Sequence, residues 1–419
     1  MSAKATYAKP PVNLPPVPPE LWITILRFAT EIPEVLDVTQ SLFRFPGETK
    51  NGIVKLKKSY KSALTTKRRL LLVCKDWKDL ATPFLYEHLV LENCHTLPLL
   101  FRTLSSSRHK SLSDSRVGNP VGWWTKRLDV FLRDDDVVSD VDATRKTGDI
   151  LFYLPNVATI TFCAGDYWNY NLPPTFISAL QKIGSNIRVL NWQSLGFSPK
   201  LGTHHFTFTS TPNLTSLQLH WLAFTGNPVL SLPVLPRLQS LSLVRVNDPI
   251  IFSTSLEEPM LMTNLFPSLT QIKLVPAQLV DDHHVRTILR LCSSTISSVY
   301  LSSDDSTEWG ATLDSLYSIH SSMTFLTLHS CRLMTDFDFH LPPSVRVLAL
   351  SSTIVQAQNW VYSSLKESLP DLKGDGLKTV VIDDKNARDF RDKHRAAAQA
   401  LIKALGEKGR RLVFGEASL

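Results

Sequence analysis

The chain has 419 residues, 43% hydrophobic and 20% charged, the balance of an ordinary water-soluble protein long enough for two or more domains. Its net charge of +7 is modest for this length and predicts no nucleic-acid partner by itself. Five scattered cysteines without a C-x-x-C pair argue against a zinc site or a disulfide scaffold, and favour free thiols in a reducing compartment, cytoplasmic or nuclear. No signal core, membrane-length apolar run, P-loop or other cofactor motif is found, so we expect no membrane association, metal or cofactor.

The N-terminal part begins with a proline-rich stretch at 1–17, which predicts an extended, mobile lead-in. A helix is expected at about 19–30, because Pro18 and Pro19 suit a first helical turn and apolar residues follow at helical spacing. From Lys50 to Arg69 the chain has eight basic residues and no acidic one. Such a run usually forms a solvated face or loop, and a localisation signal or a contact with an acidic partner is the alternative.

A second helix is predicted at 70–81, where apolar residues recur in steps of three and four. We expect it to end at Thr82, because the residue before Pro83 is disfavoured in the helical conformation. Pro83 can then begin a short new turn. Trp77 on this helix either anchors a small core of its own or faces a partner, since large aromatic side chains serve both roles.

These segments carry a resemblance to a known family. The run Val17-Pro18-Pro19-Glu20-Leu21-Trp22, followed later by Leu72-Val73-Cys74-Lys75-Asp76-Trp77 and Pro83-Phe84-Leu85-Tyr86, resembles the F-box, and more narrowly the F-box-like proteins of mushroom-forming fungi. The family usually begins Leu-Pro where this chain has Val17-Pro18, and its two motif halves lie closer together, so a basic insertion stands at about 31–69.

The resemblance covers roughly residues 14–91 and implies a small all-helical module at 18–87. It further implies docking on a Skp-type adaptor and, through it, on a cullin scaffold. The docking surface that it implies is apolar and consists of Pro18, Leu21, Ile25, Val73, Cys74, Trp77 and Leu80.

The rest of the chain repeats a short pattern, Φ-x-x-Φ-x-Φ with Φ apolar, nine times between Val157 and Ile382. The middle residues are Ile160, Leu190, Leu217, Leu241, Ile272, Val299, Leu326, Leu348 and Val380. Their spacing drifts between 22 and 32 positions, which is typical of leucine-rich repeats. We therefore predict an α/β fold in which an irregular leucine-rich-repeat solenoid with a parallel sheet spans 88–385.

Connections between the predicted strands differ in character. Helical returns are expected in some gaps, such as 175–183 and 285–291. A helical cap is expected at 386–419, with a last short strand at Val413–Phe414.

Residues between the apolar positions should line the open, concave face of the sheet. This rule places Gln218, Ser242, Lys273, Tyr300, Thr327 and Arg346 on or near that face, with His220, Arg245 and His329 beside them. The mixture has no dominant charge and suits a protein target better than nucleic acid. The cluster Asp281-Asp282-His283-His284 favours helix capping over metal binding, because neighbouring residues on a helix point in different directions.

The function implied by the resemblance is that of a non-catalytic substrate receptor in a cullin-based (SCF-type) ubiquitin ligase. The F-box would dock on the adaptor and the repeats would hold a target protein. The alternative is a repeat-based interaction scaffold without a ligase role.

Overall fold

The computed structural model describes residues 17–32, 50–114, 118–132, 142–164, 174–194, 208–220, 233–244, 266–275, 295–303, 322–330, 340–352, 367–382 and 395–414, with the single positions 289, 313, 316, 365 and 391. The chain divides into two compact units, one holding the helices that end at Glu87 and the other beginning at His88. None of the helices in these ranges is long and apolar enough to cross a membrane.

Three helices lie in the described part of the first unit, α1 (Pro19–Thr30), α2 (Lys50–Leu70) and α3 (Lys75–Glu87). Helix α1 matches its prediction, with proline in the first turn and Glu20 near the positive end of the helix dipole. Helix α2 was not predicted as a helix, and covers the basic run itself. The periodic stripe from Leu70 is broken by a turn at 71–73, after which α3 begins.

The predicted end of the second helix at Thr82 is wrong, because Pro83 lies inside α3. A proline ring removes one helical hydrogen bond and crowds the preceding turn. Burial outweighs this cost, since Ala81 and Phe84 on either side of the proline both lie in the core of the unit. Packing of the flanking residues therefore keeps the chain helical at Pro83, where local conformational preference alone would end the helix.

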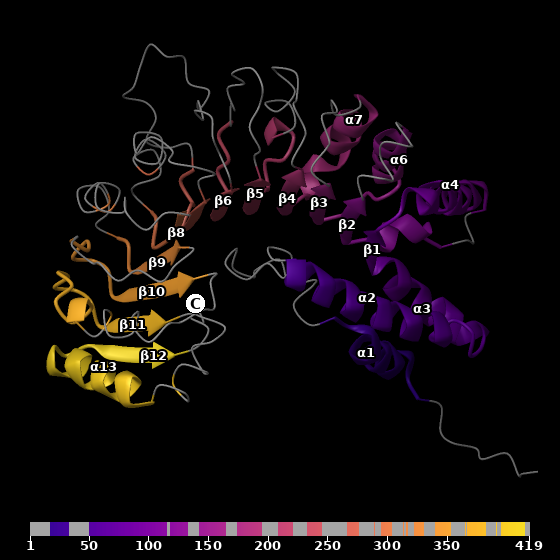
Figure 1. Ribbon diagram of the computed structural model, residues 1–419. Coiled ribbons are helices and arrows are strands. Elements are labelled where there is room, and N and C mark those ends of the chain that lie inside the picture. The colour runs from indigo at the N-terminus through magenta and orange to yellow at the C-terminus, as the bar shows by residue number, and fades with distance from the viewer. Residues whose placement is uncertain are drawn as a thin grey trace, which may run out of the picture. The chain divides into compact units, whose positions relative to one another are not determined.

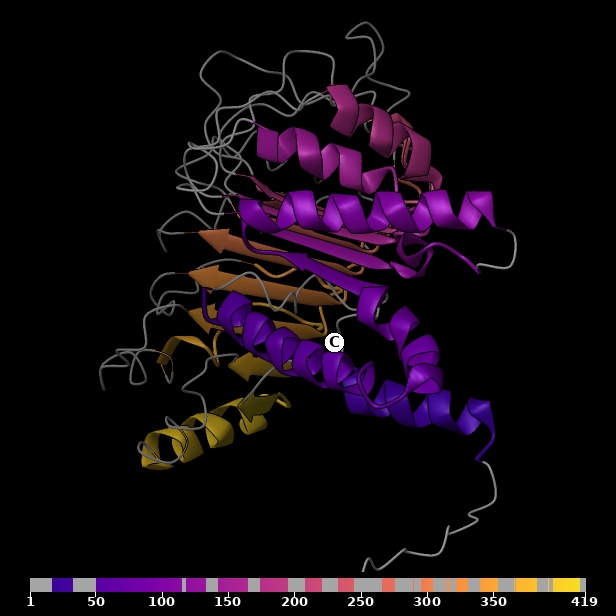
Figure 2. The same cartoon turned by 90° about the vertical axis from the view of Figure 1, so that its right-hand side faces the viewer.

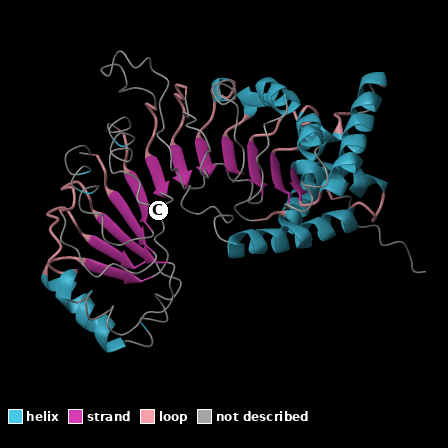
Figure 3. Ribbon diagram, turned by 45° about the horizontal axis from the view of Figure 1, so that its top comes forward, coloured by secondary structure: helices cyan, strands magenta, loops and turns pink. Residues whose placement is uncertain are grey.

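The second unit contains twelve parallel strands that pair strictly in chain order, as Figures 1 and 3 show. They are β1 (His88–Leu91), β2 (Arg127–Leu132), β3 (Thr159–Ala164), β4 (Val189–Ser194), β5 (Ser216–His220), β6 (Ser240–Val244), β7 (Gln271–Val275), β8 (Ser298–Ser303), β9 (Phe325–Ser330), β10 (Val347–Ser352), β11 (Thr379–Ile382) and β12 (Arg411–Phe414). Every predicted repeat forms one strand, from β3 to β11. Residues 413 and 414 lie in β12 as predicted.

Within its described residues this unit contains the helices α4 (Leu97–Ser113), α6 (Asp142–Leu151), α7 (Pro174–Ile183) and α13 (Arg395–Glu407). Short 3-10 turns lie at Cys94–Thr96, Val121–Trp124 and Gly184–Asn186. Figure 2 shows α4, α6 and α7 stacked on one side of the sheet. The helical return expected at 175–183 is confirmed by α7, while most of 285–291 lies outside the described residues.

The core lies between the sheet and these helices. All nine middle residues of the repeats have no exposed surface, from Ile160 to Val380. Phe176 of α7 packs edge-on against Phe162 of β3, with ring centroids 4.9 Å apart, so the apolar face of the strands is the one that meets the helices. Burying each such side chain stabilises the fold by roughly 1.5–3 kcal/mol. A single short strand could not bury these side chains by itself, so the repeats depend on stacking against their neighbours.

Polar ladders join successive repeats ahead of the strands. The side-chain amide of Asn186 donates to the carbonyl of Pro155 (2.7 Å), and that of Asn213 donates to the carbonyl of Ser185 (2.7 Å). Asn156 makes the same bond to the carbonyl of Trp123 (2.8 Å). Each turn is therefore tied to its predecessor, which satisfies backbone carbonyls that the strands leave unpaired.

Candidate functional site

The first unit presents an exposed apolar row along α1. Leu21, Ile25 and Phe28 follow one another in steps of four and three, and are 54%, 49% and 78% exposed. Leu26 and Thr30, on the opposite side of the helix, are buried. Helix α1 is therefore apolar on two sides, and the first unit buries only one of them, which leaves the other exposed to solvent.

The turn between α2 and α3 adds two more exposed apolar side chains. Leu72 is 84% exposed and Val73 is 59% exposed. Cys74 follows as an exposed free thiol, and its carbonyl accepts the first helical bond of α3 from Lys78 (3.0 Å). The turn is therefore held by the start of α3 while its apolar side chains point to solvent.

Two side-chain contacts join α1 to α3 and show how the two helices run. The rings of Trp22 and Trp77 lie 5.0 Å apart, and the guanidinium of Arg27 lies over the ring of Phe84 at 5.9 Å. The later residue of α1 contacts the later residue of α3, so the two helices run in the same direction. The turn before α3 therefore lies at the end of the pair where α1 begins. We call Leu21, Ile25, Phe28, Leu72 and Val73 the apolar patch.

The structure divides the sequence-predicted adaptor residues into two groups. The exposed ones are Pro18, Leu21, Ile25, Val73 and Cys74. Trp77 and Leu80 are half-buried and pack against the core formed by Leu26, Ala81 and Phe84. Of the two interpretations left open for Trp77, the structure therefore favours the core.

Sequence reasoning missed Phe28 and Leu72, which are the most exposed members of the patch. Phe28 could have been found, because it continues the spacing of Leu21 and Ile25 by one further turn of helix. Leu72 could not, since it belongs to the predicted helical segment and becomes exposed only because the chain turns there.

The second unit presents the sheet face that lies opposite its helices. Strand register places one residue of each strand in a row across β2–β9, consisting of Asp129, Thr161, Asn191, Gln218, Ser242, Lys273, Tyr300 and Thr327. We call this the polar row. Its members are buried except Tyr300, which is half-buried.

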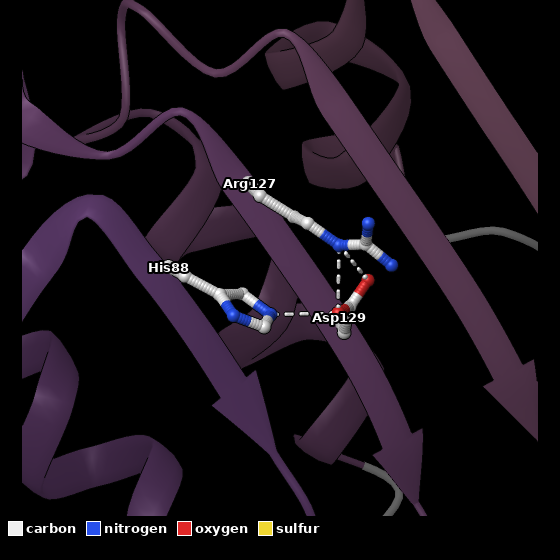
Figure 4. A network of polar contacts seen from close by, with 3 residues as sticks. All are labelled: His88, Arg127 and Asp129. Carbon is white, nitrogen blue, oxygen red and sulfur yellow. Dashed lines mark hydrogen bonds and ion pairs between the residues drawn. The ribbon is translucent and has the colours of Figure 1, made fainter. Parts of the chain in front are cut away.

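One end of the polar row carries a charged network (Figure 4). His88 of β1 lies 2.7 Å from Asp129 of β2 through Nε2 and Oδ2, and Arg127 donates from Nε to both carboxylate oxygens at 3.0 and 2.9 Å. Burial alone would raise the pKa of Asp129. The Arg127 charge and the His88 hydrogen bond outweigh burial, and hold the pKa of this carboxyl well below its usual range.

The other end of the row brings three predicted target-binding residues together. The Lys273 ammonium lies 4.5 Å from the centre of the Tyr300 ring, a cation–π contact. The ring of Tyr300 stacks on that of His329 with centroids 6.0 Å apart, and His329 Nδ1 lies 3.0 Å from the Ser351 hydroxyl. The cluster spans four neighbouring strands, β7 to β10, and combines a buried cationic group with half-buried aromatic, imidazole and hydroxyl groups.

The remaining predicted residues of this face have different placements. Gln218 and Ser242 are fully buried, so they offer less surface than an open face would. His220 ends β5, and Arg245 lies outside the described residues. Arg346 is not in the row; it precedes β10 and donates to the carbonyl of Gly376 (3.1 Å), and Ala349 stands opposite Thr327 instead.

Some polar atoms of the row have no partner within the part of the chain that the structure describes. They are the side-chain oxygens of Thr161, Asn191 and Ser242. A buried oxygen without a hydrogen bond costs about 1–3 kcal/mol. The strand pairing of the repeats therefore holds these unsatisfied polar groups in the row, whereas the carboxylate of Asp129 at its end is hydrogen-bonded to His88 and Arg127.

No group of three or more potential metal-binding side chains occurs among the described residues, and the cluster at 281–284 lies outside them. Comparison with known proteins adds no family: no family model matches the chain, and no curated protein matches its sequence.

Proposed function

We propose that this protein is a receptor that joins two proteins, with the first unit docking on a Skp-type adaptor of a cullin-based ubiquitin ligase and the repeats holding a target. The observation that carries the proposal is the apolar patch, in which five large side chains on one small helical unit stand between 49% and 84% exposed. Exposed apolar clusters of this kind mark protein contacts.

The repeat sheet supports the second half of the proposal. Successive strands place cationic, aromatic and hydroxyl side chains on one face, with Lys273 paired with Tyr300 and, two positions further along the strands, His329 paired with Ser351. Such a mixture suits a folded or extended polypeptide, which offers acceptors, donors and apolar groups in turn. The receptor would contribute position rather than chemistry, by raising the effective concentration of the target near the ligase.

The test is direct binding of the full-length protein to a purified Skp-type adaptor. Leu21→Asp places a charge at the centre of the patch, and should weaken binding by at least 30-fold, since truncating a central interface residue typically costs about 2 kcal/mol or more. Leu112→Asp is the matched control, because Leu112 is also an exposed leucine but belongs to α4 of the second unit.

Circular dichroism of both variants verifies that the helices remain folded. Equal loss of binding in both variants would contradict the assignment of the patch. Absence of binding by the folded wild-type protein would instead favour the interaction-scaffold alternative.

A further inference from the structure

The excess of positive over negative charge in the chain is concentrated on one helix. Residues 50–70 contain eight of the 45 basic residues and none of the 38 acidic residues. Without this helix, 37 basic residues would face 38 acidic ones. The net charge of +7 is therefore a property of α2, which is about 30 Å long at roughly 1.5 Å per residue.

Four of the basic side chains occupy one side of α2. Lys58, Lys61, Arg68 and Arg69 are all exposed, and fall within about 100° of one another around the helix. We call these four residues the basic stripe. The opposite side carries Tyr60, Ala63 and Leu64, which are half-buried, together with Lys67, which is buried.

The basic stripe ends where the apolar patch begins. The Leu72 amide donates to the carbonyl of Arg69 at 3.1 Å, so the last two arginines of α2 directly adjoin the exposed turn. An apolar centre with a charged border is the usual arrangement of a protein–protein interface. A nucleic acid would engage the cations but leave Leu72 and Val73 without a partner.

We propose that the protein docking on the apolar patch carries carboxylates beside its apolar contact, and that the basic stripe guides its approach and orients it. This inference rests on the proposed function, whose adaptor is the occupant. Complementary charges at the border of an interface raise association rates by 10-fold or more at low salt, and affect dissociation much less.

The experiment measures association and dissociation rates of full-length protein and purified adaptor between about 0.05 and 0.5 M salt, across which charge screening becomes strong. The stripe variant carries Lys58→Gln, Lys61→Gln, Arg68→Gln and Arg69→Gln. The matched control carries Arg102→Gln, Lys110→Gln, Lys378→Gln and Lys403→Gln. All four control positions are exposed residues of the second unit, so the net charge changes equally.

We expect the stripe variant to associate about 10-fold more slowly at low salt, with the difference vanishing at high salt and the control staying near wild type. Equal rates for the two variants would overturn this inference while leaving adaptor docking intact. No binding by the wild type would overturn the proposed function and this inference with it.

The same proteins are titrated into a labelled 20-base-pair DNA duplex and into anionic lipid vesicles. Stripe-dependent binding to either probe, without any effect on adaptor rates, would assign the stripe to a phosphate-bearing partner and also overturn the inference.

Discussion

Replacing Asp129 by Asn tests the charged network that joins the first two strands. The substitution keeps the shape of the side chain but leaves the Arg127 guanidinium buried without its counter-charge. Removing one partner of a buried ion pair typically costs about 3–5 kcal/mol, because the remaining charge is neither hydrated nor paired. We therefore expect a loss of at least about 3 kcal/mol in the stability of this part of the sheet.

The control is the neighbouring residue of the polar row. Thr161 pairs with Asp129 in register, and its buried hydroxyl has no partner within the described residues. Thr161→Val removes that unsatisfied oxygen and should leave stability unchanged or raise it by about 1 kcal/mol. The two substitutions thus lie at adjacent positions and are expected to act in opposite directions.

The assay combines urea unfolding, followed by circular dichroism, with hydrogen exchange of the amides in β1 and β2. Because repeat proteins distribute stability over neighbouring units, the effect of Asp129→Asn should be concentrated in these strands. A loss of about 3 kcal/mol corresponds to a more than 100-fold rise in local exchange. A smaller effect for Asp129→Asn than for Thr161→Val would refute the reasoning.

The same network makes stability depend on pH with a defined sign. The pKa of Asp129 is lower in the folded protein than in the unfolded chain, where it is about 3.9. Its contribution is therefore fully present above about pH 4 and is lost as the pH falls towards the folded-state pKa. The difference in unfolding free energy between wild type and Asp129→Asn should shrink below about pH 4, and a constant difference would contradict the assignment.

Two further predictions concern the solenoid and use matched pairs. Leu348→Ala, at a fully buried position of β10, should lower the unfolding free energy by about 2–5 kcal/mol, whereas Leu112→Ala at an exposed position of α4 should change it by less than about 0.5 kcal/mol. Similar urea midpoints for the two would show that the sheet core is not where the structure places it. Gly376→Ala should destabilise the turn before β11, because the added Cβ would clash with the backbone carbonyl oxygen of Pro343. Gly406→Ala in α13 meets no atom within 4 Å and should stabilise that helix by about 0.5–1 kcal/mol, so thermal shifts of opposite sign are expected.

The strands and their order were predictable from the sequence, because burial acts through a short local pattern. Each strand buries two alternate residues, and the turn before it buries one more, so the same Φ-x-x-Φ-x-Φ spacing recurs at every strand. All nine copies of the pattern between Val157 and Ile382 form parallel strands. Helices α1 and α7 were predictable for the same reason, since their apolar spacing and first-turn prolines are local signals.

Tertiary structure alone decided the features that depend on distant residues. Pro83 lies within α3 because residues on either side of it are buried in the core of the unit, a fact that no local preference expresses. His88 and Asp129 are 41 positions apart and meet only because β1 and β2 pair in one particular register. Whether a side chain such as Trp77 or Phe28 faces the core or solvent likewise depends on which helices pack around it, because an amphipathic pattern specifies a face but not its partner.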